Sequence, residues 1–226
     1  MARLVETEQS KSKKRVKGFV ITLIILVLVS VGGYFLYTKV FNKKKEKVEI
    51  KILDSLDEYG YSISDNDTKL YTDEYKVLKA LLKEKDVDME KYATEVARMF
   101  VIDLYTLDTK VNKYDVGGIE YFYKDKRDMY SQKVIDTLYK TMIDNSYGDR
   151  KQTLPEVKSI ETVSTEETKY LLGKEVVDGY LVKVTWTYKE DLGYDDEGSV
   201  IVVRDNGSNK LSVVDFQPTL KPKYDD

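Results

Sequence analysis

An uncharged stretch of 21 residues near the N-terminus, 18–38, constrains this chain more than any other feature of its sequence. Most of these residues are Val, Ile, Leu, Phe or Gly, and a helix of this length rises about 30 Å, the thickness of a bilayer's hydrocarbon core. Tyr34 and Tyr37 stand near one end, where aromatic rings suit the headgroup layer. The sequence therefore predicts a single transmembrane helix over 18–38.

A cleaved signal peptide is the main alternative, because a basic segment precedes the apolar stretch. The stretch is longer than an ordinary signal-peptide core, and no Ala-x-Ala-like cleavage site follows it. A buried core helix is a second alternative, but such helices seldom run this far without a charge. The chain has no cysteine, which excludes a lipid-modified cysteine as the anchor. We expect a retained single-pass anchor.

Flanking charge does not decide the orientation of this anchor, because six Lys or Arg residues lie on each side of it. The architecture favours one orientation. When a short N-terminal tail is followed by one span and then by a long folded domain, the tail usually stays in the cytoplasm. We therefore expect 1–17 to be a basic cytoplasmic tail in a cell-membrane protein whose C-terminal domain is extracytoplasmic. The lipid bilayer is then a predicted partner.

Charge is divided unevenly along the chain. Residues 1–51 carry 12 basic and 4 acidic side chains, a net charge of +8, whereas 52–226 carry 25 basic and 36 acidic ones, a net charge of −11. An acidic domain repels phosphate backbones, so we expect no direct nucleic-acid binding by it. The basic segment beside the span suits anionic headgroups. Heavy use of Lys, Asp, Ile and Tyr without cysteine is typical of a low-GC Gram-positive bacterium.

Periodicity predicts helices first and strands afterwards. A juxtamembrane linker over 39–70, with at most a short strand or helical turn, leads to one helix capped by Thr72 and a second capped by Asp88. The second helix, "MEKYATEVARMFVIDLYTLDTKV", is so widely apolar that we expect it to lie against a sheet. A third helix is predicted near 126–143, after the chain break at Gly117-Gly118.

Past residue 154 the apolar residues alternate, which indicates strands. Four runs are predicted strands, and a fifth, weaker run is an expected edge strand; they cover 156–164, 179–190, 198–205, 210–217 and 168–176. Asn206-Gly207 favours a hairpin between the last two strands. In the central run, the predicted core face holds Tyr180, Val182, Val184, Trp186 and Tyr188.

The predicted class is α+β: a cone-like domain over 71–218, in which two to three helices pack on a curved antiparallel sheet of four to five strands. A C-terminal tail, 219–226, follows. The element order, with "YATEVARMFVIDLYTL" as the long helix and "YLVKVTWTYKEDLGY" as a central strand, resembles the nuclear transport factor 2-like fold in membrane-anchored form. The resemblance covers about residues 88–217.

In membrane-anchored form, this fold is similar to the inner-membrane scaffold subunits of Gram-positive conjugation and type IV secretion machines. The resemblance implies assembly with other envelope proteins or with further copies of the chain. Some proteins of this fold bind small ligands or catalyse reactions inside the cone. The interior therefore needs its own examination.

The absence of histidine and cysteine removes His-based triads, most catalytic zinc sites and thiol nucleophiles. The acidic clusters "DNDTK", "DLGYDDEG" and "YDD" offer oxygen ligands but lack the pattern of an EF-hand, so we expect solvated turns. Ser-Lys pairs in "SQKV" and "SNK" come without an oxyanion motif. We expect no enzyme, no catalytic residue, no cofactor and no metal site.

Seven residues are candidates for a pocket or an interface. Asp103 falls inside the apolar second helix and is expected to pair with Lys110, Arg98 or a tyrosine hydroxyl, unless it lines the open end of the cone with Tyr105 and Tyr139. Among the 19 tyrosines, a surface patch is predicted at Tyr121, Phe122, Tyr123 and Tyr130. The alternative is that these rings pack the junction between helices and sheet.

Three functions follow from these patterns. The first is a membrane-tethered interaction or assembly domain without catalysis. The second is a cone that binds an apolar or carbohydrate-like ligand between the second helix and the sheet. The third is a carboxylate-based cell-wall hydrolase, which needs two acids facing each other across a cleft.

Overall fold

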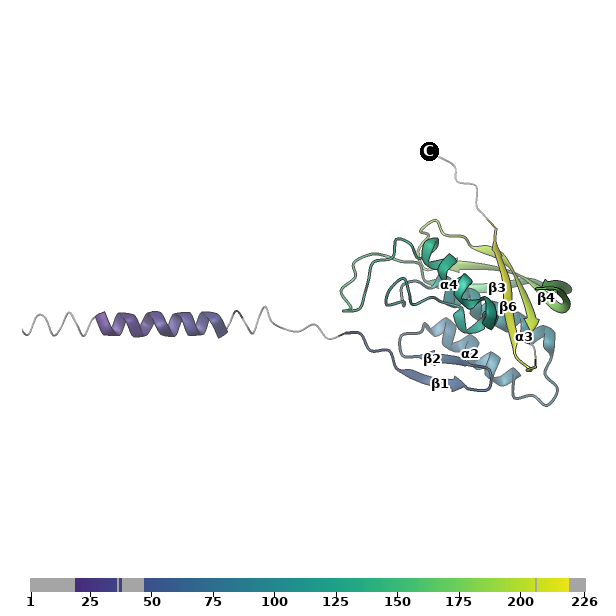
Figure 1. The fold of residues 1–226 in the computed structure, drawn as a ribbon, viewed down its shortest axis with the longest axis horizontal. Helices are drawn as coiled ribbons and strands as arrows, with labels where there is room; N and C mark the ends of the chain where they lie inside the picture. The colour runs from purple at the N-terminus through teal and green to yellow at the C-terminus, as the bar shows by residue number, and fades with distance from the viewer. Residues whose placement is uncertain (1–18, 36, 38–46, 206, 220–226) are drawn as a thin grey trace, which may run out of the picture. The chain divides into compact units, whose positions relative to one another are not determined.

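The computed structural model describes residues 19–35, 37, 47–205 and 207–219 (Figure 1). The chain divides into two compact units, Met1–Glu46 and Lys47–Asp226. Each unit is described by itself.

In the first unit, residues 19–35 and 37 are helical. Within the described residues, no helix combines the length and the apolar character that crossing a membrane requires. Residues 18, 36 and 38 of the predicted span lie outside the described residues, as do the predicted tail 1–17 and residues 39–46. The membrane anchor stays a prediction.

The second unit starts with a small hairpin, continues through helices and ends in a four-stranded sheet. The hairpin joins β1 (Ile52–Leu56) to β2 (Tyr61–Ser64). The helical part holds α2 (Lys69–Leu81), α3 (Met89–Tyr105), the 3-10 turns η1 (Ile119–Tyr121) and η2 (Lys124–Lys126), and α4 (Arg127–Asp136).

The four-stranded sheet has the strand order β3-β4-β5-β6, and every neighbouring pair is antiparallel. Its strands are β3 (Val157–Leu172), β4 (Glu175–Tyr188), β5 (Glu197–Arg204) and β6 (Leu211–Pro218). The predicted α+β class is confirmed. The last two strands, β5 and β6, pair antiparallel as predicted, and Gly207 between them has φ 78°, while Asn206 lies outside the described residues.

Helix α3 is the centre of the core. It packs against all four strands of the sheet, and ten of its side chains are buried (Figure 1). On the sheet side, Val182, Val184 and Trp186 of β4 are buried, with Tyr180 and Tyr188 partly so. The predicted core face of this strand and the predicted position of the long helix against the sheet are therefore confirmed.

Helices α2 and α3 start at side-chain caps, whereas α4 has no side-chain cap. Asp88 accepts a hydrogen bond from the Lys91 N–H at 3.1 Å, so its predicted cap is confirmed. The predicted cap at Thr72 is wrong, because α2 begins one turn earlier. There, the Thr68 hydroxyl accepts from the Tyr71 N–H at 3.2 Å, and Thr68 is extended as a cap must be.

Two predicted elements differ from the structure. The third helix, predicted over 126–143, ends at Asp136, and the chain turns so that the buried Tyr139 donates its hydroxyl to the Leu104 carbonyl at 2.9 Å. The weak run 168–176 is no separate edge strand. It is the tip of the β3–β4 hairpin, which turns at Gly173, and the sheet therefore has four strands.

Strand β3 contains a bulge at Val163, where the register with β4 shifts between Thr162 and Ser164. The Val163 side chain is 65% exposed. A bulge twists a strand and disturbs its ladder. This feature lies on an outer edge of the sheet, because β3 is the first strand in the order.

The segment predicted as a linker, 39–70, holds the β1–β2 hairpin, and the compact unit begins at Lys47. Tyr61 is fully buried, and its ring stacks on that of Tyr121 at 4.9 Å. The physical reason is burial: Tyr61 and Ile63 alternate with half-exposed serines, so the hairpin buries one of its faces.

The predicted chain break at Gly117-Gly118 is a close approach of backbone to α3. A Cβ atom at Gly117 would lie 2.1 Å from the Asp103 carbonyl oxygen. At Gly118, φ is +75° and a Cβ atom would lie 2.7 Å from the Phe100 ring. Only glycine lets the chain pass this close to the helix.

We predict that Gly117→Ala lowers the free energy of unfolding by about 3 kcal/mol, because helix backbone must move to admit the methyl group. The matched control is Gly173→Ala, which has φ +65° but open space around it and should cost only about 1–2 kcal/mol of backbone strain. Urea unfolding followed by Trp186 fluorescence measures both. Equal losses of free energy of unfolding in the two variants would show that the close approach of Gly117 to α3 does not add to the cost of the substitution.

Candidate functional site

A cavity of about 570 Å³ opens between helix α4 and strand β6. We call it the α4–β6 cavity. Its walls come from the end of α3, the η1–η2 segment, α4 and the last residues of β6. Most of the lining is apolar or aromatic, including Leu104, Tyr105, Phe122, Tyr130, Val134 and Phe216. The size and the lining are typical of sites that take an apolar group.

The interior of the second unit is filled by side chains. Met99, Phe100 and Trp186 are all buried and occupy the space between α3 and the sheet. The Phe100 ring lies 5.4 Å from that of Phe216 and 5.7 Å from that of Tyr130. The Phe100 ring thus packs behind two rings, those of Phe216 and Tyr130, that line the α4–β6 cavity.

The mouth of the cavity carries charges of both signs. Lys126 and Lys133 stand on the α4 side, and Asp195 and Asp215 on the other. The Lys126 ammonium donates to the Tyr170 hydroxyl at 2.9 Å and lies 4.9 Å from the centre of that ring. Lys126 is thereby held in place.

Tyr105 supplies the polar group nearest the cavity floor. Its hydroxyl donates to the Asp195 carboxylate at 3.4 Å, and its ring lies 4.8 Å from that of Trp186. Burial, and then the neighbouring Asp195, raise the pKa of Tyr105 well above its ordinary value. The hydroxyl therefore stays protonated at physiological pH and acts as a hydrogen-bond donor, not as a base.

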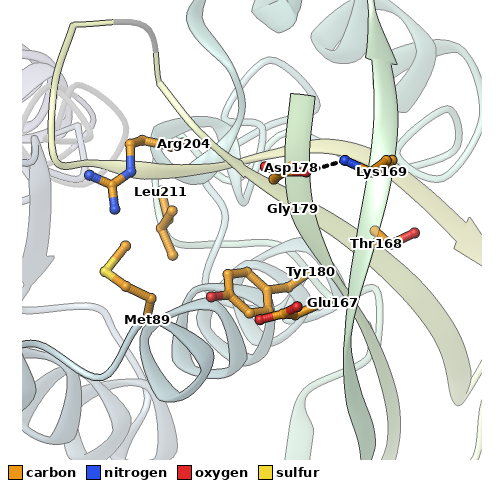
Figure 2. Close-up of a pocket in the computed structure, with 9 residues that line it drawn as sticks. All are labelled: Met89, Glu167, Thr168, Lys169, Asp178, Gly179, Tyr180, Arg204 and Leu211. Carbon is orange, nitrogen blue, oxygen red and sulfur yellow. Dashed lines mark hydrogen bonds and ion pairs between the residues drawn. The ribbon is translucent and has the colours of Figure 1, made fainter. Parts of the chain in front are cut away.

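A second hollow of about 500 Å³ lies where β3, β4 and β5 extend past the start of α3 (Figure 2). Met89, Leu211 and Tyr180 supply apolar surface, and Glu167 and Arg204 supply charge. Lys169 and Asp178 form an exposed ion pair at 2.8 Å on one side. This hollow is more polar than the α4–β6 cavity, and its charged groups are solvated.

Asp103 is paired inside the fold and does not line the cavity. Its carboxylate contacts the Lys110 ammonium and accepts from the Gly118 N–H at 2.6 Å. Burial alone would lower the pKa of Lys110, but the Asp103 carboxylate raises it above its ordinary value. The expected pairing with Lys110 is thus present, and the alternative that Asp103 lines an open cone is wrong.

The predicted aromatic surface patch is not on the surface. Tyr121, Phe122, Tyr123 and Tyr130 are all buried, and the alternative of packing at the junction of helices and sheet holds for all of them but Tyr123. Phe122 and Tyr130 stack at 4.1 Å and form one wall of the α4–β6 cavity. Tyr139 is fully buried and takes no part in the cavity.

Tyr123 belongs to a separate small cluster with Val203 and Val214 on the other face of the sheet. Of the seven candidate residues, the cavity therefore brings together Tyr105, Phe122 and Tyr130. Phe216 and Met129 were not predicted as site residues, because their place in the cavity depends on how α4 docks beside β6.

A buried polar network was also missed. Glu120 accepts hydrogen bonds from the Ser62 N–H at 3.2 Å and the Tyr71 hydroxyl at 3.0 Å. Burial raises the pKa of Glu120, followed by repulsion from Asp103. Lys210 donates to the carbonyls of Glu120 and Tyr59, which joins the β5–β6 turn to the first hairpin. These contacts are structural.

The acidic clusters act as turns and caps where the structure describes them. Asp67 accepts from the Ser64 N–H at 2.6 Å, and Asp191 accepts from the Gly193 N–H at 3.0 Å. The terminal cluster "YDD" lies outside the described residues. Within the described residues, no group of three or more acidic side chains is arranged to hold a metal ion.

No protein-family model, curated protein or solved structure matches this chain. What the site can do is therefore argued from its own residues. The α4–β6 cavity combines an apolar floor, a fixed hydroxyl donor and ammonium groups at its mouth. That combination of groups suits the binding of a ligand or of a partner protein.

We predict that Asp103→Ala lowers the free energy of unfolding by about 3–5 kcal/mol, because it leaves the Lys110 ammonium buried without a counter-ion. The matched control is Asp73→Ala, which breaks exposed pairs with Lys69 and Lys76 and should change stability very little. Urea unfolding measures both variants. A small loss for Asp103→Ala would mean that water reaches Lys110.

We also predict a pH effect at Lys210. Burial, and then the nearby Arg127, lower the pKa of Lys210 to about 8 in the folded chain from 10.5. Between these values the unfolded chain binds more protons than the folded one, so Lys210 makes the free energy of unfolding rise with pH. Lys210→Met should remove that part of the slope between about pH 8 and about pH 10. The free energy of unfolding is measured with urea across this pH range. Equal dependence on pH in the original chain and in Lys210→Met would contradict the prediction.

Proposed function

We propose that this chain is a membrane-anchored, extracytoplasmic interaction domain that binds another envelope protein through the α4–β6 cavity. The observation that carries the proposal is the α4–β6 cavity, whose lining is mostly apolar or aromatic. Met129 stands at this cavity with 67% of its surface exposed, beside the partly buried Phe216. Adaptable apolar side chains of this kind are common at protein-binding surfaces.

The uncharged stretch 18–38 supports the anchor. The element order supports a nuclear transport factor 2-like domain. On that basis, the proposed role is that of a scaffold component in a conjugation or secretion machine. The domain has no histidine or cysteine and works by contact, not by catalysis.

A second candidate is a tethered small-ligand site in the same cavity. The volume of about 570 Å³ favours it, since pockets for small ligands commonly measure about 300–1,000 Å³. In that case the Tyr105 hydroxyl and the Lys126 ammonium would orient the ligand. The two candidates differ in what occupies the cavity in the cell.

We predict that a photo-crosslinking amino acid at Met129, in intact cells that make the full chain, gives a covalent adduct with an envelope protein. The matched control is the same amino acid at Val163, which is 65% exposed on β3 and lies away from the cavity. It should give no such adduct. Adduct bands are resolved by electrophoresis and identified by mass spectrometry.

Uncrosslinked monomer from both positions would contradict the proposal. A purified chain that carries a small molecule by native mass spectrometry, lost on Met129→Lys, would favour the second candidate. An adduct with a further copy of the chain would identify the partner as itself.

A further inference from the structure

Strand β6 is the last strand of the sheet, and the first half of its outer edge is closed by hydrogen bonds. The Leu211 N–H donates to the Tyr92 hydroxyl at 3.2 Å, and the Leu211 carbonyl accepts from the Tyr61 hydroxyl at 2.9 Å. The Val213 carbonyl accepts from the Tyr123 N–H at 2.8 Å. The segment at Tyr123 thus makes a single rung beside β6 and then turns away into η2.

The second half of this edge is different. The Thr219 N–H donates to the Glu197 carbonyl of β5, so by alternation Asp215 and Gln217 also face β5, while Phe216 and Pro218 face outward. Val214 is an extra residue in β6 at this point of the ladder with β5. The outward-facing residues therefore have odd numbers up to Val213 and even numbers from Phe216 on. Among the described residues, none donates to or accepts from the outward main-chain groups of Phe216 and Pro218.

The α4–β6 cavity lies at this edge and not on one face of the sheet. Phe216 pairs with the core residue Val200, whereas Asp215 pairs with Ile201 of the opposite-face cluster. Successive strand residues point to opposite faces, yet Asp215 and Phe216 both line the cavity. The cavity therefore occupies the position that the next strand of the sheet would take.

We propose that the cavity takes an extended peptide segment of the partner protein, which adds to the sheet beside Phe216. This proposal rests on the proposed function and names the kind of partner segment. Its main chain bonds to the free Phe216 N–H and carbonyl and continues the rung that Tyr123 begins. Alternate apolar side chains pack on Phe122 and Tyr130, and an acidic side chain faces Lys133 on the α4 wall.

Main-chain groups distinguish this occupant from an apolar small molecule. A sheet edge offers donors and acceptors at the spacing of a strand, which only another extended backbone matches along its length. Pro218 has no N–H, so the ladder ends there. The register of the added strand is therefore fixed between Val213 and Pro218.

The test uses the full-length chain in detergent and ten-residue peptides, selected from a displayed library with apolar residues at alternate positions and an acidic residue between them. The readout is hydrogen exchange at single amides, resolved by mass spectrometry with electron-transfer fragmentation. Without peptide, the Phe216 amide should exchange faster than those of Asp215 and Gln217, which face β5. With peptide, the Phe216 amide should slow at least tenfold.

Two controls separate strand addition from unspecific apolar contact. A copy of the peptide with N-methyl groups on the bonding amides should bind at least tenfold more weakly, because its side chains are kept and its ladder is lost. Met129→Lys should weaken peptide binding at least tenfold, whereas the equally exposed Val163→Lys should not. Urea unfolding confirms that both variants are folded.

Several results would overturn the proposal. These are equal binding of the N-methylated peptide, an unchanged Phe216 amide in the complex, or occupation of the cavity by anilinonaphthalene sulfonate with no peptide binding. Slowing of the Phe216 amide with rising protein concentration and no peptide would name a second copy as the occupant instead. If crosslinking at Met129 captures an envelope protein while the Phe216 amide stays fast, this inference fails and the proposed function stands.

Discussion

The second unit depends on one kind of interaction: tyrosines buried in its core join distant segments through hydrogen bonds of their hydroxyls, although the buried Tyr75 hydroxyl has no partner among the described residues. Tyr61 of the first hairpin and Tyr92 of α3 bond to each other at 3.0 Å, and both bond to the main chain of Leu211. Tyr71 of α2 bonds to Tyr121 of η1 at 2.9 Å. Segments far apart in the sequence are thereby fastened to the edge of the sheet. The buried tyrosines therefore fill the core with their rings and join distant segments through their hydroxyls.

Two acids of the interior are paired in the same way, whereas part of the β6 edge is not. Asp103 is held by Lys110 and Gly118, and Glu120 by Ser62 and Tyr71, so both acids are satisfied within the fold. The outward main chain of Phe216 has no such partner among the described residues. It lies against an apolar cavity that remains accessible. An unsatisfied edge beside an apolar hollow is a place for a partner, and this pairing links the fold to its proposed role.

Sequence patterns predicted the long elements well, because burial over many residues imposes a period. The stripe that follows Asp88 and the alternation around Trp186 both appear in the structure as expected. The first hairpin was missed, since four residues around Tyr61 are too few to display a period. The destination of each tyrosine was not predictable, because a ring with a polar tip suits a core and a surface equally. The cavity depends on how α4 docks beside β6, which no local pattern records.

The bulge at Val163 has a consequence for assembly. Arg98 donates to the Ile160 carbonyl of the same strand at 3.1 Å, and charged side chains such as Glu161 and Glu166 are exposed along β3. Bulges and charges of this kind keep a strand from pairing with a neighbouring molecule. The β6 edge of the sheet can therefore accept an added strand, whereas the β3 edge resists one. These features of β3 disfavour its pairing with the β6 edge of another copy, so we expect strand addition at β6 to stop after one added strand.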